Sequence, residues 1–454
     1  MSDQQRGMHG TWVGRWTFIL AATGSAVGLG NLWKFPYITG ENGGGAFVLV
    51  YLACICAAGM PVMLAEVLLG RRGRLSPINT MKAMAEESGA PKVFQGIGWM
   101  GAVSGFFILS FYSVIAGWAL AYVIKIASGD FTGTDGAYAE ATFGGLISDP
   151  IMLTVWHTIF MIMTGWVIAR GVNKGLESTL KVLMPLLFVL MLVLFGYSLS
   201  LDGFSQGFHF LFDFDFSKLS GESVVVALGH AFFTLSLGMG AIMAYGAYMP
   251  KDQSLSKTVF SVALLDTLVA LIAGLIIFAI VFSNDLQPGA GPGLMFQTLP
   301  LAFGSMEGGV FFGTVFFVLV TFAAWSSAMS IAEPAVAWAV EKGKSRTDAT
   351  IFVCGLAWLI GLGTVLSFNE WSEYKLFGKT FFDSLDFLTA NIMLPLGGLL
   401  IAIFVGWFAS KEMAKEEAKF GSESGFKVWH FVLRYLSPLA ISIIFLHGLY
   451  KALS

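Results

Sequence analysis

Long apolar runs without charge constrain this chain more than any other feature of its sequence. Residues 263–282 contain a single ionisable side chain, Asp266. The hydrocarbon core of a bilayer is spanned by a helix of about 20 apolar residues, and a helix satisfies its own backbone groups there. With 56% hydrophobic and 12% charged residues, the chain has more apolar surface than a water-soluble globule buries, so this surface must face lipid. The sequence lacks the short alternating segments of a membrane β-barrel.

Hydropathy predicts an all-α polytopic membrane protein with eleven transmembrane helices. The predicted spans are 14–38, 46–70, 96–125, 151–170, 176–199, 222–248, 258–283, 309–340, 349–367, 380–409 and 428–450. The connecting loops are short, so we expect no appended soluble domain. The loop at 284–308 is long enough to act as a lid.

The distribution of Lys and Arg predicts the orientation of the spans. With the N-terminus inside, 19 of the 26 basic residues fall on the cytoplasmic side and six on the outer side, which is the asymmetry that sets membrane topology. An odd number of spans then places the C-terminus outside. A formal net charge of -3 gives no indication of nucleic-acid binding. Cys54, Cys56 and Cys354 lack metal-binding spacing, and we interpret all three as small buried hydrophobic residues.

Glycines interrupt two of the apolar segments. The first segment has glycines at 24, 28 and 30, and in the sixth Gly238 and Gly240 bracket Met239. Glycine costs about 1 kcal/mol in a helix interior and permits unwinding. An unwound turn frees carbonyls that suit a cation and amides that suit a carboxylate. For one such segment taken alone, close helix packing is the more common explanation.

The two interruptions lie five helices apart, which is the pattern of an inverted-repeat transporter whose binding site lies at the membrane midplane. Helices 1–5 and 6–10 would form two repeats of opposite orientation. The predicted division is 12–199 for the first repeat, 222–410 for the second and 411–454 for an additional helix. The two halves share no residue-level repeat, so this symmetry rests on topology alone.

Four motifs carry a resemblance to a known family. They are GSAVGLGNLWKFP at 24–36, ENGGGAF at 41–47, FFTLSLGMGAI at 232–242 and YMPKDQ at 248–253. Together they resemble the neurotransmitter:sodium symporters, the family that includes the bacterial leucine transporter, and the resemblance extends over the ten core helices. It implies a five-plus-five inverted repeat unwound in helices 1 and 6, one central substrate site and two sodium ions. The implied function is sodium-coupled symport of small amino acids by alternating access.

The resemblance also implies ligands for both sodium ions. The substrate carboxylate would join the first set, and Ser326 stands where the family usually has threonine. Ordinary hydrogen bonding between helices is the alternative role for Ser326 and Ser327. The implied ligands are Ala26, Asn31, Thr234 and Asp266 for the first ion, and Gly24, Val27, Ala323, Ser326 and Ser327 for the second.

The substrate site follows from the same resemblance. The amides of Leu29 and Gly30 and the hydroxyl of Tyr112 would hold a carboxylate. Monoamine-transporting relatives have an aspartate where this chain has Gly28, so we expect a substrate that brings its own carboxylate. The groups implied for the amine are Ala26, Phe233, Thr234 and Ser236, and those for the side chain are Ile108, Phe233, Met239, Ala328 and Ile331. The apolar pocket favours a hydrophobic amino acid, aliphatic or aromatic.

An ionisable group inside a membrane span is a functional candidate. Asp266 stands where the family more often has asparagine, and Ala270 stands where the leucine transporter has a glutamate and chloride-dependent members a serine. We hypothesise that Asp266 supplies the negative charge that two sodium ions require, so that chloride is not needed. We expect Glu66 to cap backbone groups freed by the break in the sixth helix.

Gates are implied on both sides of the site. Lys34 and Asp386 match the outer ion pair of the family, with Lys in place of the usual Arg, and Phe233 and Tyr112 would form an aromatic lid beneath them. The inner gate would consist of Trp12, Tyr248 and Glu341, with His9 in the usual arginine position and Arg6 as its substitute. Gly175 and Pro185 resemble the pattern by which helix 5 unwinds.

Several readings stay open. A sensor that binds amino acids without moving them is the alternative in another class, and an ion channel is a third. Another carboxylate-bearing solute, such as a small polar amino acid or an osmolyte, is the alternative substrate. No paired carboxylates, metal cluster or nucleophile–base set indicates an enzyme. The expected partners are an amino acid, Na⁺ and the lipid bilayer of a bacterial inner membrane, and the oligomeric state is left open.

Overall fold

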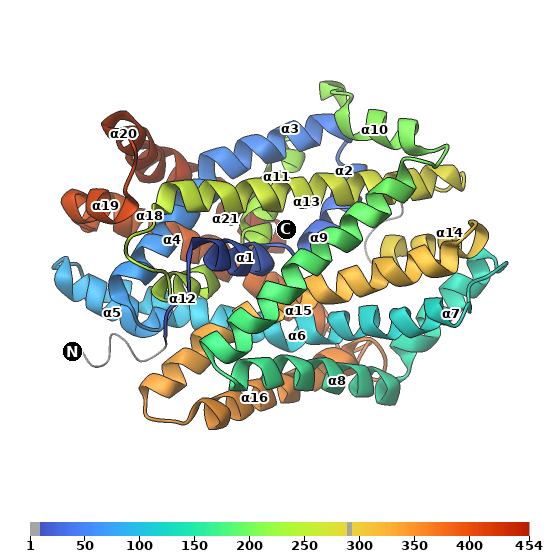
Figure 1. Ribbon diagram of the computed structural model, residues 1–454, viewed down its shortest axis with the longest axis horizontal. Helices are drawn as coiled ribbons and strands as arrows, with labels where there is room; N and C mark the ends of the chain where they lie inside the picture. Colours follow the sequence, from blue (N-terminus) through green and yellow to red (C-terminus); the bar gives the residue numbers. More distant parts are fainter. Residues whose placement is uncertain (1–9, 288–292, 454) are drawn as a thin grey trace.

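The computed structural model describes residues 10–287 and 293–453 of the 454-residue chain. Within these ranges the chain is helical, and the one β-bridge joins Leu376 to Lys379. The helices run roughly along the long axis of the molecule (Figure 1). The predicted all-α membrane fold is confirmed.

Nine stretches of the described residues are long and apolar enough to cross a bilayer. Five of them are formed by one long helix each, namely α6 (Gly96–Ala127), α8 (Pro150–Ala169), α13 (Leu255–Ser283), α15 (Gly309–Glu341) and α16 (Arg346–Ser367). The other four include π-helical turns. They comprise α3 (Gly45–Cys54) with α4 (Met60–Gly73), α9 (Ser178–Ser198), α17 (Phe381–Phe387) with α18 (Leu394–Ile403), and α20 (Glu423–Phe431) with α21 (Ser437–Leu453).

Two further segments are helical but broken near their middles. The first consists of α1 (Arg15–Ala26), a π-helical turn at Gly30–Lys34 and α2 (Phe35–Glu41). The second consists of α11 (Gly221–Thr234) and α12 (Ala241–Ala247). Both breaks fall at the glycines that predicted them. Together with the nine long stretches, these segments are compatible with the predicted eleven spans.

Short helices lie outside the predicted spans. They are α5 (Pro77–Glu87), α7 (Gly136–Ser148), α10 (Phe204–Phe212), α14 (Leu299–Ser305) and α19 (Lys411–Ala418). The predicted lid at 284–308 contains α14 and a π-helical turn at Leu294–Thr298, while 288–292 lie outside the described residues. Its closure stays a prediction.

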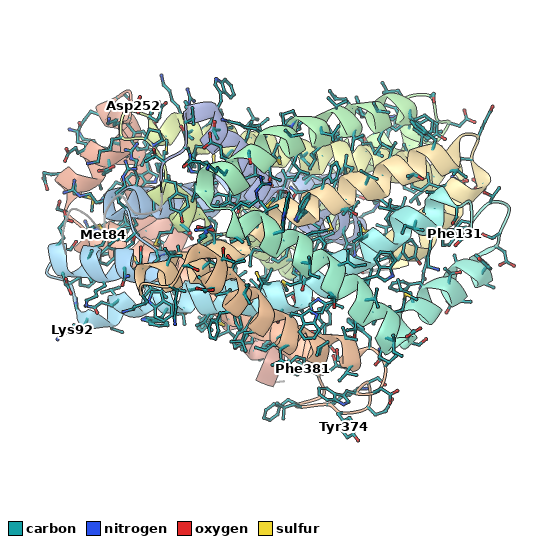
Figure 2. All side chains as sticks on the ribbon, turned by 60° about the horizontal axis from the view of Figure 1, so that its bottom comes forward. Met84, Lys92, Phe131, Asp252, Tyr374 and Phe381 are labelled. Atoms are coloured by element: carbon teal, nitrogen blue, oxygen red, sulfur yellow. The ribbon has the colours of Figure 1, made fainter. Side chains whose placement is uncertain are left out.

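The short half-helices occupy the interior of the bundle. α1 contacts α9, α13 and α15, and α12 packs against α4 and α15. Figure 1 shows α1 at the centre, surrounded by longer helices. In Figure 2, Met84, Lys92 and Asp252 lie at one end of the molecule, which we call the Asp252 end, and Phe131 lies at the other. The arrangement encloses both breaks within protein, where freed backbone groups find partners.

The interpretation of the three cysteines was partly wrong. Cys54 and Cys354 are buried, but Cys56 is exposed. Two residues of helix rotate a side chain by about 200°, so Cys56 faces away from the side that buries Cys54.

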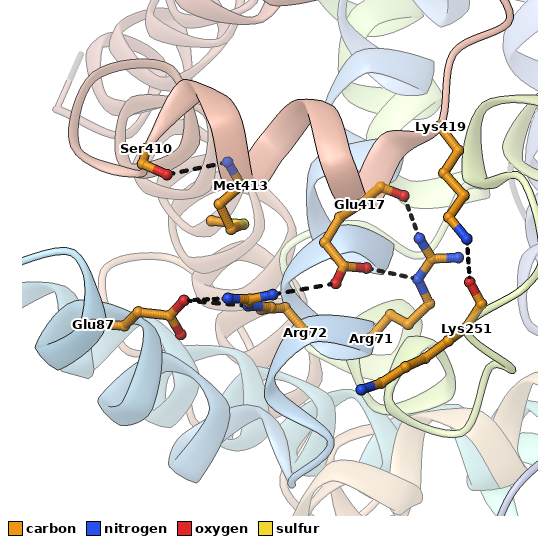
Figure 3. A network of polar contacts seen from close by, with 8 residues as sticks. All are labelled: Arg71, Arg72, Glu87, Lys251, Ser410, Met413, Glu417 and Lys419. Carbon is orange, nitrogen blue, oxygen red and sulfur yellow. Dashed lines mark hydrogen bonds and ion pairs between the residues drawn. The ribbon is translucent and has the colours of Figure 1, made fainter.

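A buried arginine ties three segments together at the Asp252 end (Figure 3). Arg71, at the end of α4, is 1% exposed, and its Nε donates to the Glu417 carboxylate of α19 at 2.9 Å. Its Nη1 donates to the Gln253 carbonyl at 2.6 Å, and its Nη2 contacts the Glu417 carbonyl. Lys419 also donates to the carbonyl of Lys251 at 2.7 Å. These contacts hold α19 against α4 and the loop after α12.

Candidate substrate and sodium site

The first break frees backbone groups between α1 and the following π-helical turn. Val27 leaves the helical conformation, with ψ at 109°. Helical hydrogen bonding resumes where the amide of Asn31 donates to the carbonyl of Gly28 at 3.2 Å. The Asn31 side-chain oxygen accepts from the Gly28 amide at 3.0 Å, and the Leu29 amide donates to the Tyr112 hydroxyl at 3.4 Å. The predicted carboxylate-binding amide and hydroxyl therefore lie together.

The second break contains three residues in the left-handed region. Their φ values are 54° at Ser236, 78° at Gly238 and 74° at Gly240. A Cβ on Gly238 would lie 2.4 Å from the Leu394 carbonyl, so only glycine fits there. The Gly238 amide donates to a Glu66 carboxylate oxygen at 2.6 Å. This contact confirms Glu66 as a cap for backbone freed by the break.

A small cavity of 20 Å³ lies where the two breaks face each other. It is lined by Ser25, Ala26, Gly28, Leu29, Gly30, Ile108, Tyr112, Phe233, Thr234, Ser236, Met239, Ser327 and Ile331. Ten of the eleven predicted substrate residues are among them. The exception is Ala328, which is buried but does not line the cavity, whereas the preceding residue Ser327 does. A cavity of this size holds about one water molecule, so its walls must separate to admit an amino acid.

Oxygen atoms of the first predicted sodium set cluster beside this cavity. Thr234 Oγ1 donates to Asp266 at 3.1 Å, and Asn31 Nδ2 donates to Asp266 Oδ1 at 2.8 Å and to Thr234 at 3.1 Å. Asp266 and Asn31 are both 0% exposed. The Asn31 amide nitrogen faces the carboxylate here, so coordination of a cation by Asn31 requires its amide oxygen to turn toward the ion. The carboxylate, hydroxyl and amide oxygens are the ligand types that hard cations prefer.

The second predicted set also comes together. Ser327 Oγ donates to the carbonyls of Gly24 at 3.4 Å and Val27 at 3.1 Å, joining α15 to the end of α1. Ser326 Oγ donates to the Ala323 carbonyl at 3.0 Å. All five predicted groups therefore lie along the contact between α1 and α15. Their chemistry, carbonyl and hydroxyl oxygen alone, fits a monovalent hard cation.

A second cavity of 210 Å³ adjoins the first. Leu29, Tyr112 and Phe233 line both, so these side chains separate them. Lys34 and Asp386 line the second cavity. Among the described residues no ion pair joins them, and the Lys34 ammonium lies 4.8 Å from the centre of the Phe233 ring. The predicted outer gate is therefore not closed by an ion pair in this structure.

The opposite side of the site is closed by a polar network. The Trp12 amide donates to the Tyr248 carbonyl at 2.9 Å, and the Tyr248 hydroxyl donates to Glu333 at 2.6 Å. Arg346 donates to Glu333 at 2.8 Å and 2.5 Å. Glu341 instead accepts from the Ser76 amide and from Asn79, both at 2.6 Å. His9 and Arg6 lie outside the described residues.

The fifth predicted span stays helical past Gly175 and Pro185. It begins as a π-helical turn at Val172–Glu177 and continues into α9.

Sequence reasoning missed several of these groups. Glu333 lies inside a predicted span, so its charge was a signal that it is functional or paired. Arg346 looked like any basic residue flanking a span. The Ser25 hydroxyl donates to Ser330 at 2.8 Å, and the Ser25 carbonyl accepts from Ser236. These contacts join distant segments, so no local sequence pattern predicts them.

Comparisons with known proteins agree with this geometry. The model of the Sodium:neurotransmitter symporter family matches residues 9–135 and 146–454. The uncharacterized sodium-dependent transporter YhdH of Bacillus subtilis is 40% identical over 440 residues, covering 96% of this chain and 97% of that protein. An uncharacterized sodium-dependent transporter of Haemophilus influenzae is 33% identical over 449 residues, covering 97% and 98%. The crystal structure of MhsT in complex with L-phenylalanine is similar with a TM-score of 0.89 and 43% identity, covering 97% and 99%. This chain therefore belongs to the sodium:neurotransmitter symporter family and is a polytopic, sodium-dependent membrane transporter, not an enzyme.

Proposed function

We propose that this chain couples sodium to the uptake of hydrophobic L-amino acids, aliphatic or aromatic. The observation that carries the proposal is the cavity between the two helix breaks. One side offers the Leu29 amide and the Tyr112 hydroxyl, which suit a carboxylate. The other side offers the apolar side chains of Ile108, Met239 and Ile331. The likeness to MhsT, whose structure contains L-phenylalanine, supports this substrate class.

Two sodium ions would bind at the two oxygen clusters. Asn31, Thr234 and Asp266, with the Ala26 carbonyl, would hold the first beside the substrate carboxylate. Gly24, Val27, Ala323, Ser326 and Ser327 would hold the second between α1 and α15. Because each ion joins a segment next to a break to a long helix, sodium binding stabilises the arrangement that forms the substrate site. Substrate and sodium affinities are then coupled.

The negative charge of Asp266 makes chloride unnecessary in this proposal. Two sodium ions and a zwitterionic substrate bring a net positive charge into a site of low dielectric constant, where an uncompensated charge is costly. Asp266 is buried and is itself part of the first cluster, where it accepts a hydrogen bond from Thr234. Its carboxylate therefore offsets that charge without a chloride ion.

Transport would proceed by alternating access in a bacterial inner membrane. Helices 1, 2, 6 and 7 would rock against a scaffold of helices 3, 4, 8 and 9, so that each inverted repeat, 12–199 and 222–410, contributes to both parts. The Asp252 end would lie in the cytoplasm and the C-terminus outside. Lys34 and Asp386 would close the outer side, and Trp12, Tyr248 and Glu341, with His9, the inner side. The basic residues of the Asp252 end, such as Arg71 and Arg72, support this orientation.

Uptake into proteoliposomes tests the proposal. Labelled leucine and tryptophan are supplied under an inward sodium gradient, with gluconate as the anion. We expect uptake that is lost when choline replaces sodium. Sodium-driven uptake of small polar amino acids or osmolytes alone would favour the alternative substrate class, and binding without uptake would favour a sensor. Uptake that requires chloride would reject the charge role of Asp266 and keep the symporter.

A further inference from the structure

An apolar groove of 370 Å³ opens on the outer surface of the bundle between α8 and α16. These two helices run side by side along the lower edge of Figure 1. Small residues form part of the groove, namely Gly165, Ala169, Cys354 and Gly355, and Ile162 and Trp166 flank it with 65% and 58% of their surfaces exposed. The groove shares no lining residue with the substrate cavity.

The polar groups that line the groove are already bonded within the protein. The Trp358 indole donates to Thr158 at 2.9 Å, and the Thr158 hydroxyl donates to the Thr154 carbonyl at 2.6 Å. The Thr350 hydroxyl donates to the Arg346 carbonyl at 2.8 Å. The groove therefore presents apolar surface to its occupant, and in a bilayer an acyl chain matches that surface.

A basic group lies where the groove reaches the end of α8. Arg170 directly follows the groove residue Ala169, and its guanidinium lies 4.6 Å from the centre of the Trp166 ring. Arg170 is exposed, and no carboxylate of the described residues lies within 4.0 Å of it. Tryptophan at a membrane surface marks the level of the lipid headgroups. An unneutralised guanidinium at this level suits a phosphate.

The neighbouring start of α16 leaves this positive charge unopposed. Arg346 Nε donates to the Ile168 carbonyl at 3.0 Å, so the start of α16 adjoins the end of α8. The charge of Arg346 itself is balanced by Glu333. Lys344 and Asp348, nearby in the chain, are both exposed and carry opposite charges that offset each other. The net positive charge at the rim of the groove therefore comes from Arg170.

We propose that this groove binds an anionic phospholipid, with an acyl chain along Gly165 and Gly355 and the phosphate at Arg170. A basic pocket between transmembrane helices at the headgroup level is the arrangement that selects anionic lipids. A zwitterionic lipid fits the apolar groove equally well but gains less from the rim, because its headgroup carries a compensating positive charge. The proposal concerns a site outside the transport pathway and does not depend on the transported substrate.

Native mass spectrometry of the full-length protein tests it with phosphatidylglycerol and phosphatidylcholine of identical acyl chains. We expect the wild type to prefer phosphatidylglycerol, and Arg170→Gln to lower that preference about fivefold, since one basic residue near the surface contributes about 1 kcal/mol. Lys82→Gln removes an exposed charge elsewhere at the Asp252 end and should leave the preference unchanged.

A second variant tests the acyl-chain part of the site. A Cβ on Gly355 meets no atom within 4 Å, so Gly355→Leu fills the groove without a clash and favours the helix. It should weaken binding of both lipids, whereas Gly196→Leu, an equally open position on α9, should not. Equal affinity of the wild type for both lipids would overturn the proposal in favour of a neutral occupant. Unchanged lipid binding by Arg170→Gln or by Gly355→Leu would overturn it as well.

Discussion

At the residue scale, Asp266 is a buried carboxylate that accepts several hydrogen bonds inside an otherwise apolar helix. Both of its carboxylate oxygens accept from Thr234 at 3.1 Å, and Asn31 donates to Oδ1. The side chain lies within α13, a 29-residue helix that is long and apolar enough to cross a bilayer. A buried carboxylate held only by neutral donors is poorly compensated. A cation beside it supplies the missing charge.

Replacement of this carboxylate tests its charge role. Asp266→Asn keeps the size and one acceptor oxygen, replaces the other oxygen with an amide nitrogen, and removes the negative charge. Because charge interactions are strong in a buried site, we expect sodium-driven uptake in gluconate to fall at least about tenfold, with recovery in chloride if that anion can replace the lost charge. Glu66→Gln, which alters a buried acid bonded to backbone, should leave the anion dependence unchanged. Chloride-free uptake at the wild-type level by Asp266→Asn would reject the hypothesis.

At the element scale, the contact between α4 and α19 depends on a buried ion pair. Arg71 is 1% exposed and Glu417 12% exposed, whereas the adjacent pair of Arg72 and Glu87 is 34% and 40% exposed. Removal of one partner of a buried pair costs about 3–5 kcal/mol, because it leaves an uncompensated charge. An exposed pair contributes about 0.2–1 kcal/mol. The two pairs differ in burial, and Glu417 in addition lies 3.8 Å from Arg72.

We therefore expect Glu417→Gln to lower the melting temperature in detergent far more than Glu87→Gln does. The double variant Arg71→Met with Glu417→Met should recover part of the loss, since an apolar pair of similar volume tolerates burial, but the carbonyls of Gln253 and Glu417 lose their Arg71 donor. Thermal unfolding followed by tryptophan fluorescence measures all four proteins. Equal shifts for Glu417→Gln and Glu87→Gln would mean that burial of the Arg71 pair does not stabilise α19.

The elements also show what the sequence could predict. Apolar runs predict helices because nothing else satisfies the backbone in lipid, and the glycine clusters marked both breaks, including Gly238 with its positive φ. Contacts between distant segments, such as Arg71 with Glu417, leave no local pattern. The gathering of Asn31, Thr234 and Asp266 was foreseen through family resemblance, not through composition or spacing. Cys56 was misassigned because an apolar run does not reveal which face of a helix is covered.

At the scale of the whole molecule, the two sides of the site differ. Toward the side of Lys34 and Asp386, a cavity of 210 Å³ reaches down to Phe233. On the other side, Trp12, Tyr248 and Glu333 are joined by hydrogen bonds, and Arg346 links Glu333 to α8 through the Ile168 carbonyl. The network connects the segment before α1 and the end of α12 to α15, α16 and α8. In the alternating access that we propose, the segment before α1 and the end of α12 separate from α15, α16 and α8 when the inner side opens.

This arrangement predicts that Glu333 holds the inner side closed. Glu333→Gln leaves Arg346 without its counter-charge and weakens the acceptor of the Tyr248 hydroxyl, so the closed state loses stability relative to the open one. A cysteine at Ser330, a buried position on α15 between Ser327 and Glu333, reports the opening in a background without Cys54, Cys56 and Cys354. We expect a hydrophilic thiol reagent to modify it about tenfold faster in Glu333→Gln, which corresponds to about 1.4 kcal/mol.

Asp348→Asn is the matched control, because it removes an exposed charge at the start of α16, the helix that carries Arg346. This variant should leave the labelling rate unchanged. If Glu333→Gln is folded and transports but labels no faster than the control, the network stabilises the fold without acting as a gate.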